Sequence, residues 1–194
     1  MEKSTSPITI RPATADDIAL IVRVLVMAMG EDAAPSYCGE KYLDVLSEIV
    51  ATQGTQYHYS HAWVAELDGR PAAAMVAYDG AALPRLRANT LAIVHRYRPL
   101  EINFDETQAG EYYLDSIAVL PEFRGQGLAS ALIGHLKSQL RAQSYPILGL
   151  IVDVDNPTAE RLYTALGFKA LNYMDFFGHR MKHMQCQLRE PLEI

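Results

Sequence analysis

Apolar residues along this chain first predict a set of short strands. Seven runs are alternating or continuously apolar and are rich in β-branched and aromatic side chains, which suit a pleated, half-buried strand. Asp68-Gly69 lies between the second and third runs and is a strong signal for a two-residue hairpin. The runs cover residues 8–11, 62–67, 72–78, 112–119, 147–154, 168–174 and 180–188.

Helical spacing of apolar residues accounts for much of the remaining chain. Thr14 and Asp17 resemble a capping box at the start of the first helix, which ends at Gly30. Asp155 or Asn156 caps the last helix, which has a proline in its first turn. The predicted helices cover residues 14–30, 39–53, 83–97, 128–143 and 157–166, and residues 31–38 are predicted to be loop.

Length and charge narrow the class of protein. At 194 residues the chain (1–194) fits a single domain with a substantial core, and no repeat, low-complexity segment or linker divides it. Its net charge of −6 argues against binding to nucleic acid or to an anionic membrane, because both need a basic surface. No apolar run approaches a membrane span, and the amino terminus lacks the apolar region of a signal peptide. We therefore expect a cytoplasmic protein.

A strand, a glycine-bearing turn and a helix start follow one another between residues 111 and 130. Pro121 ends the strand because it has no N–H to donate, and the helical pattern begins at Leu128. The first turn of a helix leaves backbone N–H groups without partners and carries the positive end of the helix dipole. Gly125 and Gly127 lack a Cβ, so an anion can approach their amides closely. The pattern predicts that a pyrophosphate binds here.

Two other interpretations of this turn remain open. The glycines can serve only a tight connection from strand to helix, as an isolated Gly-x-Gly often does. The turn also half matches the dinucleotide-binding fingerprint, although Ser130 replaces its third glycine and five residues separate Val119 from Gly125. Asp153 lies 28 positions after Gly125, whereas the fingerprint places its acidic residue about 20 positions on. The dinucleotide interpretation is therefore weak.

Residues 80–110 form an unusually long segment between the third and fourth predicted strands. Its helical part carries several arginines and no acidic residue before Glu101. This basic face either guides an anionic substrate, since long loops beside a site are often lids, or is a solvated surface. The arginines are Arg85, Arg87, Arg96 and Arg98.

Two motifs resemble the GNAT superfamily of acyl-CoA-dependent N-acyltransferases. The family's Arg/Gln-x-x-Gly-x-Gly/Ala motif at a helix start is matched by Arg124, Gly127 and Ala129, and a second segment matches at 156–168. That segment contains Asn156, Ala159, Leu162-Tyr163 and Leu166-Gly167-Phe168. The resemblance covers nearly all of the chain apart from residues 80–110. It implies an α/β (α+β) GNAT fold, with a mixed, mostly antiparallel sheet of six to seven strands flanked by helices on both faces.

The resemblance implies acetyl-CoA as co-substrate and no metal. Main-chain amides of the turn and the first helical turn would hold its pyrophosphate. The fourth and fifth strands of family members splay at a bulge, expected here near residues 117–119 and 151, where backbone groups would pair with the pantetheine arm and the thioester. Asn156 contacts this arm, caps its helix, or does both. The implied cofactor-binding residues are Ile117, Ala118, Val119, Arg124, Gly125, Gln126, Gly127, Leu128, Ala129, Ser130, Asn156 and Tyr163.

The implied reaction is acetyl transfer to a primary amine by direct attack in a ternary complex, because no cysteine near the motif can act as a covalent relay. The resemblance makes Tyr163 the general acid toward the departing thiolate, with an ordinary aromatic helix residue as the alternative. Glu111, Tyr113 and Asp115 share one strand face by alternation. Glu111 or Asp115 is therefore a candidate base, with a surface carboxylate or a water chain as the alternatives.

Partners are less closely defined. The resemblance implies a small-molecule amine or a protein amino group as acceptor, and a homodimer formed through the late residues 173–177.

His179 and His183 have the metal-ligand spacing of a helix but lie in a predicted strand, where that spacing does not bring the two side chains together. We therefore expect each histidine to be hydrogen-bonded within the protein or exposed to solvent. Residues 57–59 line the acceptor side or pack in the core. Two alternative functions are a non-catalytic acyl-CoA-binding or sensing module and a structural interaction domain.

Overall fold

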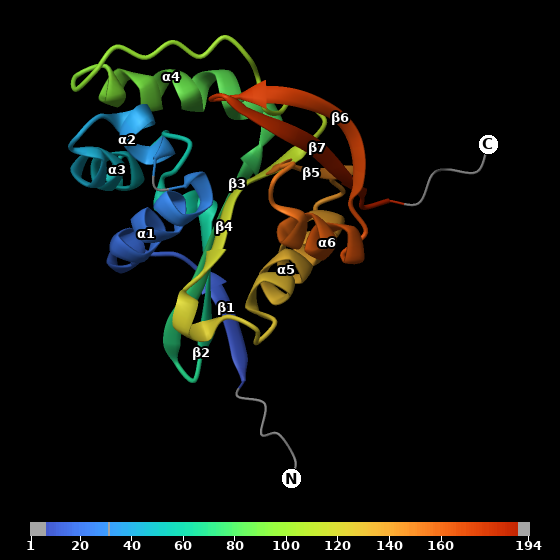
Figure 1. Ribbon diagram of the computed structural model, residues 1–194. Coiled ribbons are helices and arrows are strands. Elements are labelled where there is room, and N and C mark those ends of the chain that lie inside the picture. The colour runs from blue at the N-terminus through green and yellow to red at the C-terminus, as the bar shows by residue number, and fades with distance from the viewer. Residues whose placement is uncertain (1–6, 31, 190–194) are drawn as a thin grey trace.

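A mixed sheet of seven strands forms the centre of the computed structural model, which describes residues 7–30 and 32–189 (Figure 1). The strand order is β1-β2-β3-β4-β5-β7-β6, and all neighbours are antiparallel except β4 and β5. This confirms the predicted mostly antiparallel sheet. The strands are β1 (Ile8–Pro12), β2 (Ala62–Leu67), β3 (Arg70–Asp79), β4 (Tyr112–Val119), β5 (Ile147–Asp153), β6 (Lys169–Phe176) and β7 (His179–Gln187).

Helices cover both faces of the sheet, as predicted. Three of them pack on one face and two on the other, and a separate apolar core fills each side (Figure 1). The first group is α1 (Ile18–Met29), α2 (Ala33–Cys38) and α3 (Tyr42–Ala51), and the second is α5 (Leu128–Ala142) and α6 (Pro157–Ala165). A further helix, α4 (Leu83–Val94), lies beyond the end of the sheet near α3. No helix among residues 7–30 and 32–189 is long and apolar enough to cross a membrane.

Short-range signals placed the element ends well. Asp68 and Gly69 join β2 to β3 with φ values of 51° and 71°, the left-handed pair that a tight hairpin requires. The Asp17 carboxylate accepts a hydrogen bond from the Thr14 amide at 2.8 Å, just before α1. Short 3-10 turns flank several elements: η1 (Ala15–Asp17), η2 (Tyr59–His61), η3 (Gly80–Ala82) and η4 (Pro121–Phe123).

The predicted loop at 31–38 is wrong, because most of it forms the short helix α2. Two alanines and a proline in its first turn permit a helix, and Gly39 ends it with φ of 83°. Tyr37 and Cys38 are buried against the α1 and α3 side of the sheet. Tertiary burial therefore stabilises a helix that is too short to be stable alone.

The pairing between β4 and β5 is confined to one end. Only Tyr112 with Leu148 and Tyr113 with Gly149 are paired, so the two strands diverge beyond these residues. On its other edge, β4 has a bulge at Asp115, since Val76 pairs with Ser116 while Ala77 pairs with Leu114. The bulge therefore lies two residues before the expected range of 117–119. Its position is set by pairing with β3, a long-range contact that the local pattern does not contain.

Candidate active site

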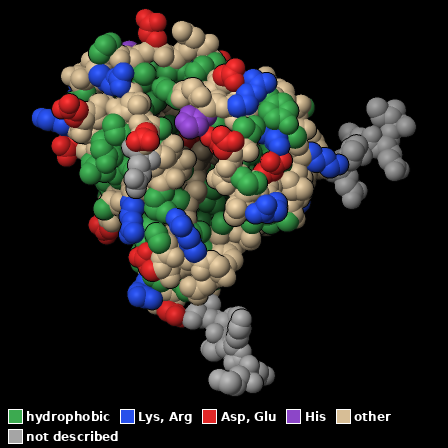
Figure 2. Space-filling view, viewed as in Figure 1, with side chains coloured by type: hydrophobic (Ala, Val, Ile, Leu, Met, Phe, Trp, Pro, Cys, Tyr) green, Lys and Arg blue, Asp and Glu red, His purple; other side chains and the backbone are tan. Residues whose placement is uncertain are grey.

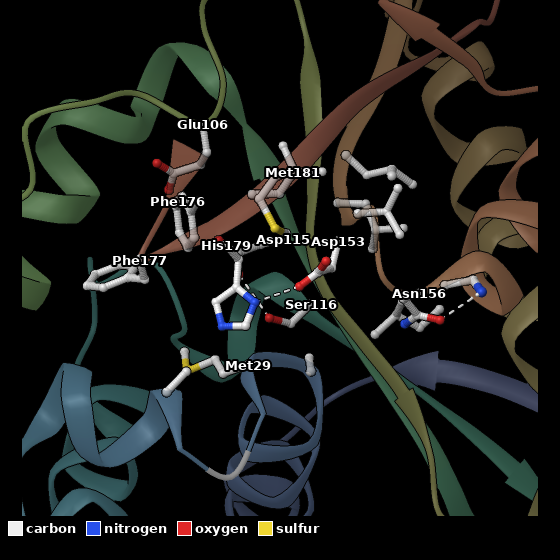
Figure 3. Close-up of a pocket in the computed structure, with 18 of the residues that line it drawn as sticks. Met29, Glu106, Asp115, Ser116, Asp153, Asn156, Phe176, Phe177, His179 and Met181 are labelled. Atoms are coloured by element: carbon white, nitrogen blue, oxygen red, sulfur yellow. Dashed lines mark hydrogen bonds and ion pairs between the residues drawn. The ribbon is translucent and has the colours of Figure 1, made fainter. Parts of the chain in front are cut away.

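A cavity of about 290 Å³ fills the gap between the diverging β4 and β5. Residues from α1, α2, α6 and the β6–β7 hairpin complete its wall, and the corresponding face of the molecule is hollowed (Figure 2). Figure 3 shows Asn156 at one end and Glu106, Phe176 and Phe177 toward the other. These two regions are called the Asn156 end and the Phe177 end below.

The divergence of the strands leaves backbone groups available inside the gap. Strand β4 beyond Tyr113 and β5 beyond Gly149 have no partner on their facing edges within the described chain. N–H and C=O groups on such edges seek hydrogen bonds, because leaving them buried without partners is costly. Among the three predicted strand residues, Ile117 lines the cavity, whereas Ala118 packs on the α1 side and Val119 on the α5 side.

The glycine-bearing turn after β4 has the geometry of an anion site. Gly125 and Gly127 have φ values of 75° and 81°, which explains why the turn carries glycine at both positions. Within residues 7–30 and 32–189, the amides of Gly125, Gln126 and Gly127 donate no hydrogen bond. The amides of Leu128, Ala129 and Ser130 follow in the first turn of α5, where a helix offers no carbonyl partner.

Space in front of the turn is open. A Cβ added at Gly125 or Gly127 would meet no atom within 4 Å, so the glycines serve backbone conformation rather than close packing. Arg124 is exposed, and its Nε donates to the Val119 carbonyl at 3.4 Å. A group of exposed amides without protein partners at a helix start fits a phosphate.

Tyr163 of α6 and Asn156, which caps the start of α6, both lie in the cavity wall. Tyr163 is 9% exposed, and burial raises its pKa to about 12, so the phenol carries its proton at neutral pH. The structure thus places Tyr163 in the cavity wall, and its role as general acid stays a prediction. The Asn156 side chain accepts a hydrogen bond from the Ala159 amide at 3.1 Å, which confirms the predicted helix cap.

Asp115 is the candidate base that lines the cavity. Tyr78 donates to its Oδ2 at 2.8 Å and Ser116 to its Oδ1 at 2.9 Å. Burial raises the pKa of Asp115 to about 6, although these two hydrogen bonds limit the rise. The carboxylate is therefore mostly ionised at pH 7 but basic enough to accept a proton.

Glu111, the other candidate base, lies outside the cavity lining. It is 1% exposed, and its carboxylate accepts hydrogen bonds from Thr107 at 2.7 Å, His183 at 2.9 Å and Gln185 at 2.6 Å. Although burial alone would raise its pKa, these donors hold the pKa below its usual value. Alternation suggested a shared face with Asp115, but the bulge at Asp115 interrupts that alternation.

Among the polar residues of the cavity wall, Glu106, Asp153 and His179 were not identified as site residues from the sequence. His179 Nδ1 lies 2.7 Å from Asp153 Oδ2, which places a paired histidine in the wall (Figure 3). Glu106 comes from the segment after α4, is 6% exposed, and pairs with Arg87. No local signal marks these residues, because loops and hairpin ends bring them together over long sequence distances.

The arginines of residues 80–110 do not form a free basic face toward the cavity. Arg87 pairs with Glu106 and with Asp105, and Arg96 pairs with Glu48. Arg98 donates to the carbonyls of residues 35 and 36, and none of the four arginines lines the cavity. The interpretation that this face guides an anionic substrate therefore lacks support.

Comparisons with known proteins agree with this architecture. The model of the Acetyltransferase (GNAT) family matches residues 29–168. The crystal structure of an acetyltransferase is 31% identical, with a TM-score of 0.76 over 93% of this chain and 100% of that chain. The fold of yncA from Salmonella typhimurium, solved with its cofactor acetyl-CoA, is similar at 21% identity and a TM-score of 0.61, covering 95% of this chain and 96% of that one.

A curated relative adds a partial match. Acetyltransferase SG1711 from Sodalis glossinidius is 32% identical over 78 residues, which cover 40% of this chain and 53% of that protein. The match thus spans about half the length of this relative. The family model covers more than half of the present chain, and the seven-stranded sheet with its diverging central strands agrees with it. The chain therefore belongs to the GNAT family of acetyltransferases.

Proposed function

We propose that this protein transfers the acetyl group of acetyl-CoA to a primary amine by direct attack in a ternary complex. The observation that carries the proposal is the cavity between β4 and β5, whose wall contains both the half-buried Asp115 carboxylate, with its raised pKa, and the buried Tyr163 phenol. The turn with unpaired amides lies between η4, which follows β4, and the start of α5. Strand β4 thus connects the proposed anion site to the cavity that contains Asp115 and Tyr163.

The residues present fit acetyl-CoA as a co-substrate. Amides from Gly125 to Ser130 would donate to its diphosphate, and Arg124 would add a positive charge beside it. The free edge of β4 at Ile117, together with Asn156, would hold the pantetheine arm. When bound, this co-substrate supplies an acetyl group activated as a thioester. Backbone N–H groups of the free strand edges would stabilise the oxyanion that forms on the thioester carbonyl.

Two side chains would move the protons. The Asp115 carboxylate takes one proton from the ammonium form of the acceptor, and the free amine then attacks the carbonyl carbon. As the C–N bond forms and the C–S bond breaks, the Tyr163 hydroxyl protonates the departing thiolate. The Tyr163 phenolate recovers a proton from the nitrogen, which becomes the amide. The net products are an acetamide, a free thiol and one proton, which Asp115 returns to solvent.

Direct attack is favoured over a covalent relay. A relay needs a nucleophilic cysteine beside the thioester, preferably with a lowered pKa. Cys38 and Cys186 are both buried, and neither lines the cavity. Burial raises the pKa of Cys38 to about 12, which makes its thiolate scarce.

Thiol release from acetyl-CoA across a panel of primary amines tests the proposal. Tyr163→Phe should lower kcat by at least about tenfold, or about 1.4 kcal/mol of barrier. The rise in melting temperature on adding coenzyme A should persist, since the phosphate site is intact. Tyr97→Phe is the matched control, because Tyr97 is exposed and lies outside the cavity. Unchanged turnover in Tyr163→Phe would remove the acid role.

The same measurements separate the other functions. A binding or sensing module would show the thermal shift with coenzyme A but release no thiol with any amine. A structural interaction domain would show neither response.

A further inference from the structure

The charge lining the cavity is one-sided. Glu106, Asp115 and Asp153 all contribute to its wall, whereas no lysine or arginine of the described chain does. His179 is the remaining basic side chain, and it is already paired with Asp153 at 2.7 Å. A cavity with this lining favours a cation and disfavours an anion.

Two of these carboxylates are built into the structure rather than placed by chance. Glu106 is buried and held by Arg87 and by Gln56, whose Nε2 lies 3.2 Å from its Oε1. The same Gln56 nitrogen donates to the Tyr78 hydroxyl at 3.1 Å, and Tyr78 donates to Asp115. A continuous chain of hydrogen bonds therefore fixes Glu106 and Asp115 relative to each other.

The hydrogen bonds and the ion pair that Glu106 and Asp115 make do not fully offset the effect of burial on their pKa values. Burial raises the pKa of Glu106 to about 7 and that of Asp115 to about 6. The ion pair with Arg87 lowers the pKa of Glu106, but this arginine also serves the exposed Asp105. A positively charged ligand in the cavity would favour the ionised forms and return both pKa values toward their usual range.

The wall of the Phe177 end is otherwise aromatic. Phe177 packs edge-on against Tyr37, with ring centroids 5.7 Å apart, and against Phe104 at 6.1 Å and Phe176 at 5.0 Å. Aromatic faces bind apolar groups and also attract cations.

The backbone of Phe177 supports a ligand-binding role for this end. Phe177 has φ of 48°, a left-handed conformation that is unfavourable for a bulky residue and that hairpin turns usually assign to Gly, Asn or Asp. Such strain persists where the surroundings hold it, often at functional sites. Here it holds an aromatic ring in the cavity wall (Figure 3).

We propose that the acceptor carries its primary ammonium group on a compact apolar or aromatic body, lacks a carboxylate, and is selected by Glu106; this inference rests on the proposed acetyl transfer. Glu106 and Asp115 attract the ammonium group, and the aromatic wall receives the body. The α-carboxylate of an amino acid would meet three carboxylates and no free cation in the wall. A cavity of about 290 Å³ that also admits the thioester leaves room for roughly one ring.

This assignment gives residues 80–110 a role. Glu106 and its partner Arg87 both belong to this segment, and α4 carries the arginine. The segment thus delivers one specificity-determining carboxylate to a cavity whose other two carboxylates, Asp115 and Asp153, lie on the sheet strands β4 and β5. Its buried ion pair, rather than an exposed basic face, is the functional feature.

Matched amines test the class of acceptor on the full-length wild-type protein. Thiol release is compared for 2-phenylethylamine, phenylalanine, phenylalanine amide and spermidine. We expect kcat/KM for 2-phenylethylamine to exceed that for phenylalanine by about 100-fold or more, because of the buried like charges. Phenylalanine amide, which lacks only the negative charge, should recover most of the difference. Equal or better use of phenylalanine or spermidine would overturn the inference while leaving acetyl transfer intact.

A binding measurement separates the two proposals. Calorimetric titration with 2-phenylethylamine and with phenylalanine, in the presence of coenzyme A, requires no turnover. Preferred binding of 2-phenylethylamine, combined with no thiol release from acetyl-CoA in the kinetic assay, would support this class of ligand and contradict the transferase. Absence of preference would overturn the acceptor class whatever the turnover.

Variants then locate the selectivity. Glu106→Gln should raise KM for 2-phenylethylamine by about tenfold with little change in kcat, because the lost attraction acts on ground and transition state alike. In Glu106→Gln, the ratio of kcat/KM for 2-phenylethylamine to kcat/KM for phenylalanine should also decrease. Glu101→Gln is the matched control, since Glu101 is an exposed carboxylate of the same segment. An unchanged KM in a folded Glu106→Gln protein, judged by its thermal shift with coenzyme A, would contradict the role of Glu106.

Discussion

Asp115 shows how one position can be tuned by its surroundings. It is the extra residue of the β4 bulge, and its carboxyl group faces the cavity. Removal from water raises its pKa to about 6, while Tyr78 and Ser116 stabilise the ionised form. An aspartate at an ordinary exposed position would be too weak a base to assist amine attack. The proposed role of Asp115 therefore depends on its burial.

Replacing Asp115 tests this role through the pH profile. In the wild type, kcat/KM should rise as the pH increases through about 6, because only the ionised carboxylate accepts the proton. Asp115→Asn should lower kcat by about 100-fold or more and abolish this limb of the profile. Asp175→Asn, at an exposed carboxylate on β6, is the control. A retained limb near pH 6 in Asp115→Asn would assign the base to another group.

Asp115→Asn, which should lower activity, should at the same time raise the stability of the folded protein. Because the pKa of Asp115 is raised in the folded state, the folded protein binds this proton more tightly than the unfolded chain does. The contribution of Asp115 to stability therefore falls as the pH rises from the unfolded pKa of 3.8 to about 6. Asp115→Asn removes this penalty, so its gain in melting temperature should be larger at pH 8 than at pH 5. Thermal denaturation at both pH values measures the difference.

At the scale of single elements, the turn into α5 is the part that local sequence predicted best. Gly125 and Gly127 adopt left-handed backbone conformations, and the helix begins at Leu128 as expected. These features depend on backbone sterics over a few residues, so they can be read from the chain directly. The position of the β4 bulge and the existence of α2 depend on packing against distant residues. The bulge lies two residues before the predicted range, and the loop predicted in place of α2 is wrong.

Two glycines of this region give a matched test of the anion site. Gly127→Ala forces a side chain into φ of 81°, at a cost of roughly 1–2 kcal/mol, and should disturb the amides that face the phosphate. We expect a lower melting temperature and a smaller thermal shift with coenzyme A. Gly134→Ala, inside the same helix and with open space around it, should stabilise the protein by about 0.5–1 kcal/mol and leave the shift unchanged. An unchanged shift in Gly127→Ala would argue against this turn as the phosphate site.

At the scale of the molecule, Glu111 holds together the point where the central strands separate. It precedes β4, lies against Gly149 of β5, and accepts hydrogen bonds from His183 and Gln185 of β7 and from Thr107. A Cβ at Gly149 would overlap the Glu111 carboxyl group. Glycine at this position thus makes room for a buried carboxylate that connects three segments of the chain. We propose that Glu111 is a structural residue and not the base.

A double-mutant cycle tests this arrangement. Gly149→Ala alone should destabilise the protein by about 1–3 kcal/mol through overpacking. In a Glu111→Ala background the added methyl group has space, so the same change should cost little, giving a coupling energy of about 1–3 kcal/mol. Urea denaturation of the four proteins measures it. Additive effects would show that Gly149 and Glu111 do not constrain each other.

Sequence patterns alone predicted the strands, most helices and the glycine turn. All of these rest on periodicity or on spacing within a few tens of residues, where local sterics and hydrogen bonding dominate. Only the tertiary structure distinguished the two candidate bases, since Asp115 lines the cavity and Glu111 does not. It also brought Glu106, Asp153 and His179 to one cavity. These outcomes depend on a bulge, on strand divergence and on long-range ion pairs. Such contacts arise between residues far apart in the chain, so no local pattern encodes them.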